Sequence, residues 1–288
     1  MPEAGRVEIY EVGPRDGLQN EARAISTQDK VRLVDLLSAC GFRHVEAASF
    51  VSPRWVPQMA DGADVLDRIR RPAGTIYAAL TPNLRGYEHA RAARAGEVAI
   101  FASASEGFSR RNINCSVTES MERFHPIVVA AAKDGIPVRG YVSCVVACPY
   151  DGPTEPTQVA LVTERLLELG CREVSLGDTI GAGTAETVAA MLRAVRSAAP
   201  VDRLAGHFHD TGGRALECVA AALEEGVRVF DASVAGAGGC PYAPGSAGNV
   251  ATGRVLDFVE AGGFATGIDR VRLAEAEAFM TQLLGRST

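Results

Sequence analysis

The chain has 288 residues, which is close to the roughly 250 residues of a single (β/α)8 barrel. Hydrophobic residues make up 47% of it and charged residues 22%, a balance that excludes disordered and fibrous proteins. The formal net charge of −6 argues against a nucleic-acid partner, and no apolar run is long enough to span a membrane.

The chain contains seven cysteines, an odd number, and it is long enough to build a core without disulfides. This usage is typical of a reducing compartment, and most of the thiols are expected to be buried and free. Cys144 and Cys148 form a C-x3-C pair with no second pair or histidine cluster nearby, so we expect them to be packing residues. Strand-like sequence begins by Val7 without a basic and apolar leader, and the expected location is therefore cytoplasmic.

Short strand-like patterns alternate with longer amphipathic patterns along the whole chain. Strands are predicted over residues 7–12, 44–49, 75–80, 98–103, 138–145, 173–177, 204–209 and 229–234. Helices are predicted over residues 27–40, 84–95, 120–133, 156–169, 184–199 and 213–225. Several helices end at a glycine, which tolerates the left-handed conformation of a helix C-terminus: Gly41, Gly96, Gly135, Gly170 and Gly226.

Eight parallel strands can close on themselves and leave no exposed sheet edge. We therefore predict an α/β fold, a (β/α)8 TIM barrel that forms a single domain over residues 1–288. Residues 262–288 are a C-terminal helical appendage, which packs either on the barrel or on a partner subunit of a homodimer or higher homo-oligomer. The alternative is an open doubly wound sheet, but the G-x-G-x-x-G turn of that fold is missing after the first strand.

Functional residues of such a barrel are expected at the carboxyl ends of its strands, and several unusual stretches fall there. The stretch 13–21 (GPRDGLQNE) follows the first strand and sets Arg15 beside Asp16, either in an active site or as a structural ion pair. His207 and His209 form H-x-H on the seventh strand. Both imidazoles project from one face, because residues i and i+2 of a strand do, and this spacing favours metal binding.

Two further features point to chemistry at the same end of the barrel. Residues 236–249 contain five glycines and two prolines, which is typical of a mobile active-site loop, and Cys240 within it is the predicted reactive cysteine. Glu46 and Asp178 are carboxylates in apolar strands, so each needs a partner if it is buried. Arg15 is a candidate partner for either.

Closure of the barrel brings the last strand beside the first, so residues from both ends of the chain can reach one point. Asp16, His207, His209 and Asn249 would offer a carboxylate, two imidazoles and an amide oxygen there. This mixed set suits Mg²⁺ or Mn²⁺ better than structural zinc, although a catalytic zinc is also compatible with it.

The stretch 109–114 (SRRNIN) follows the fourth predicted strand. Arg110, Arg111 and Asn112 within it either bind the phosphates of a large anionic ligand or belong to a solvated loop. The sequence alone favours the solvated loop.

Eight motifs, in the right order along the chain, resemble the 3-hydroxy-3-methylglutaryl-CoA lyase family of metal-dependent TIM barrels. They are GPRDGLQNE, VEAASFVSPRWVPQM, LTPNLRG, SASEGFSRRNINCS, CPYDGPTEP, SLGDTIGAGT, HFHDTGGRAL and GGCPYAPGSAGN. The resemblance implies cleavage of an acyl-CoA substrate, 3-hydroxy-3-methylglutaryl-CoA, to acetyl-CoA and acetoacetate with a divalent cation. By motif it implies these site residues: Asp16, His207, His209 and Asn249 as metal ligands, Arg15 as catalytic arginine, and Glu46, Asp178 and Cys240 as further active-site positions.

The implied reaction is a retro-Claisen cleavage, in which a base removes the C3 hydroxyl proton and an enolate forms on the thioester. Arg15 would stabilise the enolate oxygen, and Cys240 would return a proton to the acetyl-CoA enolate. His207, Asp16 and Glu46 are all candidates for the base, and the sequence does not separate them.

The sequence departs from the family pattern at a few positions. Gly212 stands where tyrosine is frequent, Phe208 replaces a smaller residue, and Gly253 and Arg254 replace an acidic pair. Because the catalytic residues are intact, these changes bear on the acyl substrate. A lyase for a bulkier 3-hydroxy-3-alkylglutaryl-CoA is therefore an alternative, with Gly212 as the position that would leave room.

A Claisen-condensing enzyme of the isopropylmalate or homocitrate synthase type would share the Arg-Asp and H-x-H stretches. The GGCPYAPGSAGN stretch and the short C-terminal segment favour the lyase over such condensing enzymes. A non-enzymatic protein that only binds metal would leave Arg15, Glu46 and Cys240 unexplained.

Overall fold

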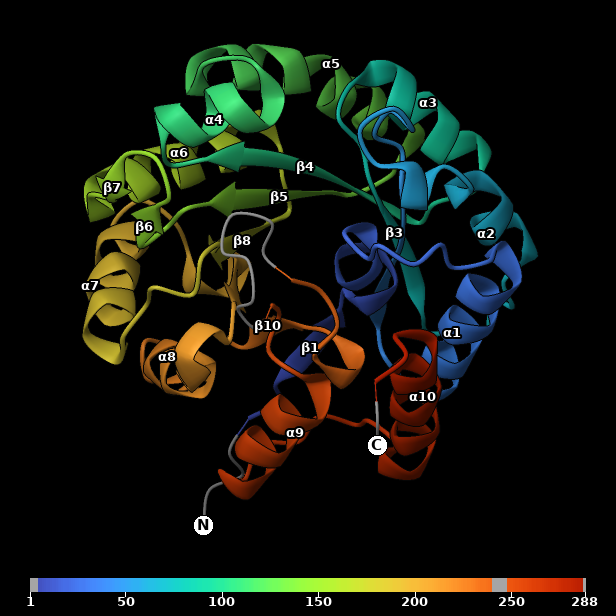
Figure 1. Ribbon diagram of the computed structural model, residues 1–288. Helices are drawn as coiled ribbons and strands as arrows, with labels where there is room; N and C mark the ends of the chain where they lie inside the picture. The colour runs from blue at the N-terminus through green and yellow to red at the C-terminus, as the bar shows by residue number, and fades with distance from the viewer. Residues whose placement is uncertain (1–4, 240–247, 287–288) are drawn as a thin grey trace.

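The computed structural model describes residues 5–239 and 248–286. Eight parallel strands close into a barrel in the order β1-β10-β9-β8-β5-β4-β3-β2 (Figure 1), as the sequence predicts. Each predicted strand is present, with ends that differ by at most two residues. The strands are β1 (Glu8–Glu11), β2 (His44–Ser49), β3 (Ile76–Leu80), β4 (Glu97–Ser103), β5 (Val138–Ser143), β8 (Glu173–Asp178), β9 (Leu204–Phe208) and β10 (Val229–Ala232).

Helices surround the barrel, and the six predicted ones are confirmed (Figure 1). The helices are α1 (Thr27–Ala39), α2 (Gly62–Arg68), α3 (Leu84–Ala92), α4 (Glu106–Ile113), α5 (Val117–Asp134), α6 (Pro156–Leu169), α7 (Ala185–Arg196), α8 (Ala215–Glu224) and α9 (Thr252–Ala261). A small antiparallel pair, β6 (Ala147–Cys148) and β7 (Gly152–Pro153), follows β5. Three of these helices, α2, α4 and α9, are not predicted by the sequence pattern.

The stretch predicted as a solvated loop lies mostly in helix α4, which corrects that interpretation. Ser105 caps the helix by accepting a hydrogen bond from the backbone N–H of Phe108. The helix ends where Asn114 adopts a left-handed conformation, with φ of 53°. A helix of 8 residues is too short for its periodicity to stand out from flanking polar sequence.

The strands are apolar because helices cover them outside and side chains fill the barrel inside. Every residue of β2 and of β8 is buried, including the charged ones. The glycine prediction for helix ends holds at Gly135 and Gly170, which have φ of 69° and 120°. It is wrong at Gly96, because Arg94 adopts the left-handed conformation instead, with φ of 62°.

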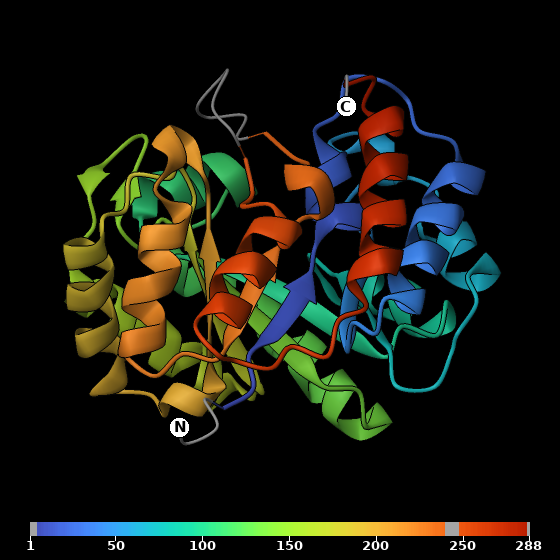
Figure 2. The same ribbon diagram turned by 90° about the horizontal axis from the view of Figure 1, so that it is seen from below.

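The C-terminal appendage packs on the barrel of its own chain. Helix α10 (Arg270–Leu283) lies beside α1 in both views (Figures 1 and 2). It buries Leu273, Ala276 and Met280, and the Arg32 guanidinium of α1 lies 4.4 Å from the ring centroid of Phe279. Within the described ranges, no helix combines the length and apolar character that crossing a bilayer requires.

Closure brings β9, β10 and β1 side by side, as the sequence predicts for the two ends of the chain. Asp231 of β10 pairs in register with His207 of β9, and Glu11 of β1 with Ala232 of β10. Beyond the strand ends, an antiparallel bridge joins His209 to Asn249. Residues more than 200 positions apart in the sequence therefore meet at one end of the barrel.

Candidate active site

A cavity of about 930 Å³ opens at the carboxyl ends of the strands. Its floor is formed by the buried Arg15 and Tyr141, together with the partly buried Asp16, His207 and His209. One wall is apolar and is formed by Val51, Leu80 and Phe101. At its rim lie Trp55, Arg111, Asn112 and Arg123, of which Trp55 is 83% exposed.

A tight turn after β1 delivers Arg15 and Asp16 to the floor. Residues Gly13–Gly17 form a single π-helical turn, a geometry that is frequent at functional sites. The carboxylate of Glu11 holds the turn from below, because it accepts hydrogen bonds from the backbone N–H groups of Gly13 at 2.8 Å and Val234 at 2.9 Å. It also accepts one from the Thr252 hydroxyl at 2.7 Å, so β1, β10 and α9 are joined under the site.

Two carboxylates fix the buried Arg15 side chain. Its Nε donates to Glu46 Oε2 at 2.7 Å, and its Nη1 donates to Asp16 Oδ1 at 2.6 Å. Burial alone would lower the pKa of Arg15, but Glu46 and Asp16 outweigh burial and raise it. The guanidinium is therefore a permanently charged group with a fixed direction, and its partner is Glu46 rather than Asp178.

Glu46 lies beneath Arg15 and does not line the cavity. Its Oε2 also accepts a hydrogen bond from the Tyr141 hydroxyl at 3.2 Å. Its Oε1 has no hydrogen-bond partner among the described residues, and burial raises the pKa of this carboxyl above its ordinary value. Glu46 consequently acts on the cavity through Arg15.

The predicted metal ligands come together at the floor. One carboxylate oxygen of Asp16 and one nitrogen each of His207 and His209 all lie within 4.8 Å of one another. The Nε2 atoms of the two imidazoles are 3.3 Å apart. Asn249 lies beside them, with its Nδ2 donating to Asp16 Oδ2 at 2.7 Å.

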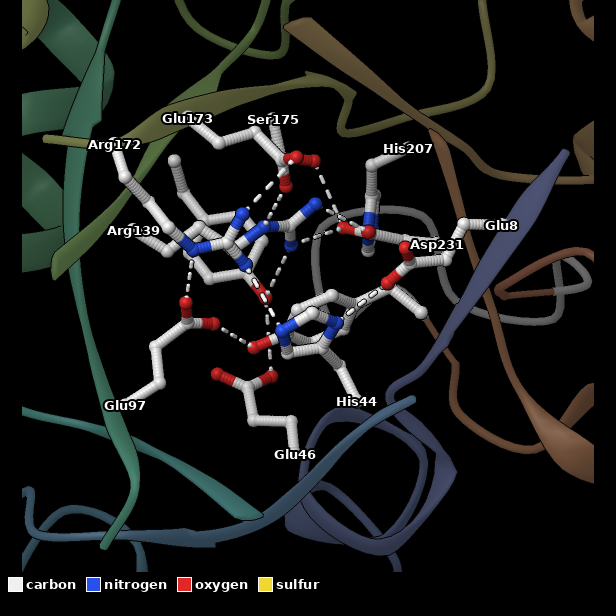
Figure 3. A network of polar contacts seen from close by, with 12 residues as sticks. Glu8, His44, Glu46, Glu97, Arg139, Arg172, Glu173, Ser175, His207 and Asp231 are labelled. Atoms are coloured by element: carbon white, nitrogen blue, oxygen red, sulfur yellow. Dashed lines mark hydrogen bonds and ion pairs between the residues drawn. The ribbon is translucent and has the colours of Figure 1, made fainter. Parts of the chain in front are cut away.

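The chemistry of these side chains fits a divalent cation. Asp231 Oδ2 lies 3.1 Å from His207 Nδ1 (Figure 3), and Arg139 and His207 outweigh burial to lower the pKa of Asp231. Because Asp231 is ionised it can only accept, so His207 carries a proton on Nδ1 and its neutral form has a lone pair on Nε2. Burial and the neighbouring His207 lower the pKa of His209 to about 4, and a neutral imidazole is the form that binds metals.

Asp178 lies at the end of β8 but does not line the cavity. Its carboxylate accepts backbone hydrogen bonds from Ala182 at 3.1 Å and from Gly183 at 2.7 Å. Burial raises its pKa, and these two N–H groups oppose that effect. The neighbours Gly177 and Thr179 do line the cavity, so Asp178 shapes the site by holding the loop after β8.

Of the three predicted phosphate-binding residues, two line the cavity and one does not. Arg110 is an exposed residue that forms an ion pair with Glu106 at 3.7 Å and does not line the cavity. Arg111 and Asn112 line it, and the Arg111 guanidinium lies 4.6 Å from the ring centroid of Tyr150. Arg123, on α5, is a second arginine at this rim that sequence reasoning missed.

The cysteines divide into a buried set and one position in the glycine-rich loop. Cys240, the predicted reactive cysteine, lies outside the described residues. Cys144 and Cys148 are buried, free and packed with Phe108, as predicted. A Cβ on Gly238 would lie 3.0 Å from Asn249 Nδ2, so a side chain there would crowd the site.

The family departures lie around the cavity rather than in it. Gly212 is exposed in a short turn with φ of 73°, and Phe208 is buried in the core; neither lines the cavity. The expectation that Gly212 enlarges the pocket therefore has no support from its position. Arg254 forms an ion pair with Asp210, and a Cβ on Gly253 would lie 2.5 Å from Glu277 Oε1.

Several residues around the floor were not identified from the sequence: Glu11, Arg139, Tyr141 and Asp231. Three of them could have been identified: Glu11, Arg139 and Asp231 are charged residues inside otherwise apolar strands, the same pattern that singled out Glu46. Tyr141 carries none, since tyrosine is an ordinary strand residue.

Comparison with known proteins connects this geometry to one family. A family model described as HMGL-like matches residues 6–280. The chain is 54% identical over 282 residues to the "3-hydroxy-3-isohexenylglutaryl-CoA/hydroxy-methylglutaryl-CoA lyase" of Pseudomonas aeruginosa, which covers 98% of this chain and 94% of that relative. Among solved structures, the HMG-CoA lyase of Brucella melitensis superposes with a TM-score of 0.97 at 58% identity, covering 98% of this chain and 100% of the other. An HMG-CoA lyase of Acinetobacter baumannii, solved with coenzyme A and 3-methylmalate, gives a TM-score of 0.93 at 36% identity, covering 98% and 92%.

Proposed function

The chain belongs to the HMGL-like family, and we infer that it cleaves 3-hydroxy-3-methylglutaryl-CoA to acetyl-CoA and acetoacetate with the help of a divalent cation. The observation that carries this inference is the position of a charged, fixed arginine beside a carboxylate and two imidazoles on one cavity floor. Arg15, Asp16, His207 and His209 form that group.

Asp16, His207, His209 and Asn249 are the residues that would hold the cation, with Mg²⁺ or Mn²⁺ best suited to this donor set. When bound, the cation would acidify the C3 hydroxyl of the substrate and orient its carboxylate. Because Nδ2 of Asn249 donates to Asp16, the amide would serve as a ligand through its oxygen.

We propose that Arg15 stabilises the negative charge that develops on the thioester oxygen as the carbon–carbon bond breaks. Its ion pairs with Glu46 and Asp16 fix the guanidinium before the substrate arrives, so no reorganisation is needed during the reaction. Electrostatic stabilisation of this kind is often the largest single contribution to catalysis.

We propose that the base is Asp16 or His207, because Glu46 does not line the cavity. With Nδ1 committed to Asp231, His207 presents one lone pair on Nε2, so it can hold the cation or take the C3 hydroxyl proton, but not both. Cys240 remains the proposed acid for the acetyl-CoA enolate, and it lies outside the described residues.

We propose that the coenzyme A moiety of the bound substrate extends from the cavity to the surface across the rim formed by Arg111, Asn112 and Arg123. Arginine suits phosphate recognition because its planar group donates several parallel hydrogen bonds. The solved complex of the Acinetobacter relative with coenzyme A supports a thioester ligand of this size. Arg110 does not line the cavity and forms an ion pair with Glu106, so it is not part of this proposal.

The test of this proposal is an assay of the acetoacetate released from 3-hydroxy-3-methylglutaryl-CoA. The enzyme is first treated with EDTA and is then supplied with Mg²⁺ or Mn²⁺. We expect little activity after chelation, recovery on metal addition, and no recovery in His209→Ala. Full activity of the metal-stripped enzyme would contradict the role of the cation, and no acetoacetate under any condition would contradict the lyase.

A second substrate is favoured by the apolar wall of Val51, Leu80 and Phe101, and by the isohexenyl substrate in the name of the Pseudomonas relative. We propose that a longer 3-alkyl group is accepted along this wall. Val51→Phe should lower kcat/KM for the isohexenyl thioester more than for the methyl thioester, while Gly212→Ala should leave the ratio unchanged. Equal losses for both substrates would contradict this assignment.

The cytoplasmic location and a homo-oligomeric state also remain proposals. Cys40, Cys115, Cys144, Cys148, Cys171 and Cys218 are all free and buried, which supports a reducing compartment. Sedimentation of the purified protein would show its oligomeric state.

A further inference from the structure

Beneath the cavity floor, a network of charged and polar side chains fills the inside of the barrel (Figure 3). Its centre is Arg139, on β5, whose side chain is 0% exposed. We propose that Arg139 is a positioning residue that fixes both halves of the active site. One branch runs through Asp231 to His207, and the other runs through Tyr141 to Glu46 and Arg15. The first branch rests on the metal site proposed above.

The first branch sets the direction of His207. Arg139 binds Asp231 with two hydrogen bonds, from Nη2 to Oδ1 at 2.8 Å and from Nη1 to Oδ2 at 3.1 Å. These two bonds hold the Asp231 carboxylate in one orientation, and its Oδ2 lies 3.1 Å from His207 Nδ1, within hydrogen-bond distance. Nε2 of His207 then faces His209 and Asp16 with its lone pair.

The second branch sets the direction of Arg15. Arg139 Nη1 also donates to the Tyr141 hydroxyl at 3.0 Å, which leaves the hydroxyl proton to be donated to Glu46 Oε2 at 3.2 Å. The same Glu46 oxygen accepts from Arg15 Nε. One guanidinium thus orients the hydroxyl that helps to hold the carboxylate beneath the catalytic arginine.

Only arginine can serve both branches, because each branch takes a hydrogen bond from a different N–H group of the planar guanidinium. Nε is occupied by Glu173 Oε1 at 2.8 Å, which leaves the two terminal nitrogens for Asp231 and Tyr141. The guanidinium also lies 4.0 Å from the ring centroid of Tyr10 and 5.0 Å from that of Tyr141. Lysine would keep the charge but lose the fork of donors and the stacking.

The experiment compares Arg139→Lys with Arg172→Lys, using Mn²⁺ affinity measured by electron paramagnetic resonance together with kcat and KM. Arg172 is a matched control because it contacts Glu97 and Glu173 in the same network but reaches neither Asp231 nor Tyr141. We expect Arg139→Lys to bind Mn²⁺ about 10- to 100-fold more weakly, the range for partners that orient a ligand. It should also lose kcat with a KM within about threefold, while Arg172→Lys stays near wild type.

Two further variants separate the branches and keep the test decisive if Arg139→Lys fails to fold. Asp231→Asn should weaken Mn²⁺ binding, whereas Tyr141→Phe should lower kcat and leave Mn²⁺ affinity unchanged. Wild-type Mn²⁺ affinity in folded Arg139→Lys or in Asp231→Asn would overturn the first branch, and wild-type kcat in Tyr141→Phe would overturn the second. Failure of the wild-type protein to bind Mn²⁺, or undiminished binding by His209→Ala, would instead overturn the metal site itself.

Discussion

At the scale of single residues, the site contains buried charges, each of which is paired with an opposite charge. Arg15 is nearly inaccessible, yet it lies against two carboxylates that keep it charged and fixed. An unpaired buried charge would be costly, so each member of this group stabilises its partners in addition to its proposed part in the reaction.

Replacement of Arg15 by glutamine should lower kcat about a hundredfold to a thousandfold, with a much smaller rise in KM, because the enolate charge appears only on the way to the transition state. Steady-state kinetics on the methyl substrate measures this. Arg165→Gln, a substitution of an exposed arginine on α6, is the control and should be unaffected. A variant at position 15 that keeps wild-type kcat and loses only affinity would show that Arg15 merely binds substrate.

Glu11 should make stability depend on pH. Burial raises its pKa from 4.5 to about 7, so between these values the native state holds a proton that the unfolded chain has lost. The free energy of unfolding then falls as pH rises across that window, by up to roughly 3 kcal/mol from this group. Chemical denaturation at pH 5 and pH 8 should show that Glu11→Gln gains stability relative to wild type over this range. A constant difference between the two proteins would mean that Glu11 is ionised throughout.

At the scale of elements, the loops after the strands are held by side chains from the strands themselves. Asp178 on β8 accepts the backbone N–H groups of Ala182 and Gly183, while its neighbours face the cavity. The geometry of this loop therefore depends on a carboxylate that does not line the cavity.

Asp178→Asn should lower the free energy of unfolding by about 1–3 kcal/mol, because an amide replaces one of two acceptor oxygens and opposes a backbone N–H. Thermal or urea unfolding measures the loss, and Glu164→Gln on the exposed face of α6 should change it by less than about 0.5 kcal/mol. A variant with wild-type stability but greatly reduced kcat would assign Asp178 to the chemistry instead.

The elements also show how far sequence reasoning reaches. The eight strands could be predicted because each is a short apolar run between glycine-rich or amphipathic segments. Closure of the barrel then predicts that the last strand lies beside the first. That contact is what brings Asp16, His207, His209 and Asn249 together. Short helices such as α4 could not be predicted, because one or two turns carry too little periodicity.

What the sequence could not supply was the direction in which each side chain points. Glu46 and Asp178 give the same signal, a carboxylate in an apolar strand, yet Glu46 faces Arg15 and Asp178 faces backbone N–H groups outside the cavity. Arg110 and Arg111 are adjacent in the sequence, but on a helix they project in different directions, and only Arg111 reaches the cavity.

At the scale of the whole molecule, the C-terminal helix joins elements from the two ends of the chain. Helix α10 packs on α1 and on the turn Val234–Gly236, which follows β10. It thereby links the first helix of the barrel to the turn after the last strand, and its apolar residues extend the core of the barrel.

Met280→Ala should lower the free energy of unfolding by about 2–5 kcal/mol, because Met280 is fully buried in this contact. Val271→Ala lies on the same helix at a position that is 74% exposed, and it should change stability by less than about 0.5 kcal/mol. Similar effects of the two substitutions would show that α10 contributes little to the stability of the barrel.

The most direct measurement is the location of Mn²⁺ in crystals of the protein, by anomalous scattering at an energy where manganese is the main scatterer. The account predicts one strong peak within bonding distance of Asp16, His207 and His209, and loss of that peak in His209→Ala. A peak away from these side chains, or no peak in a protein that cleaves its substrate at full rate, would contradict it.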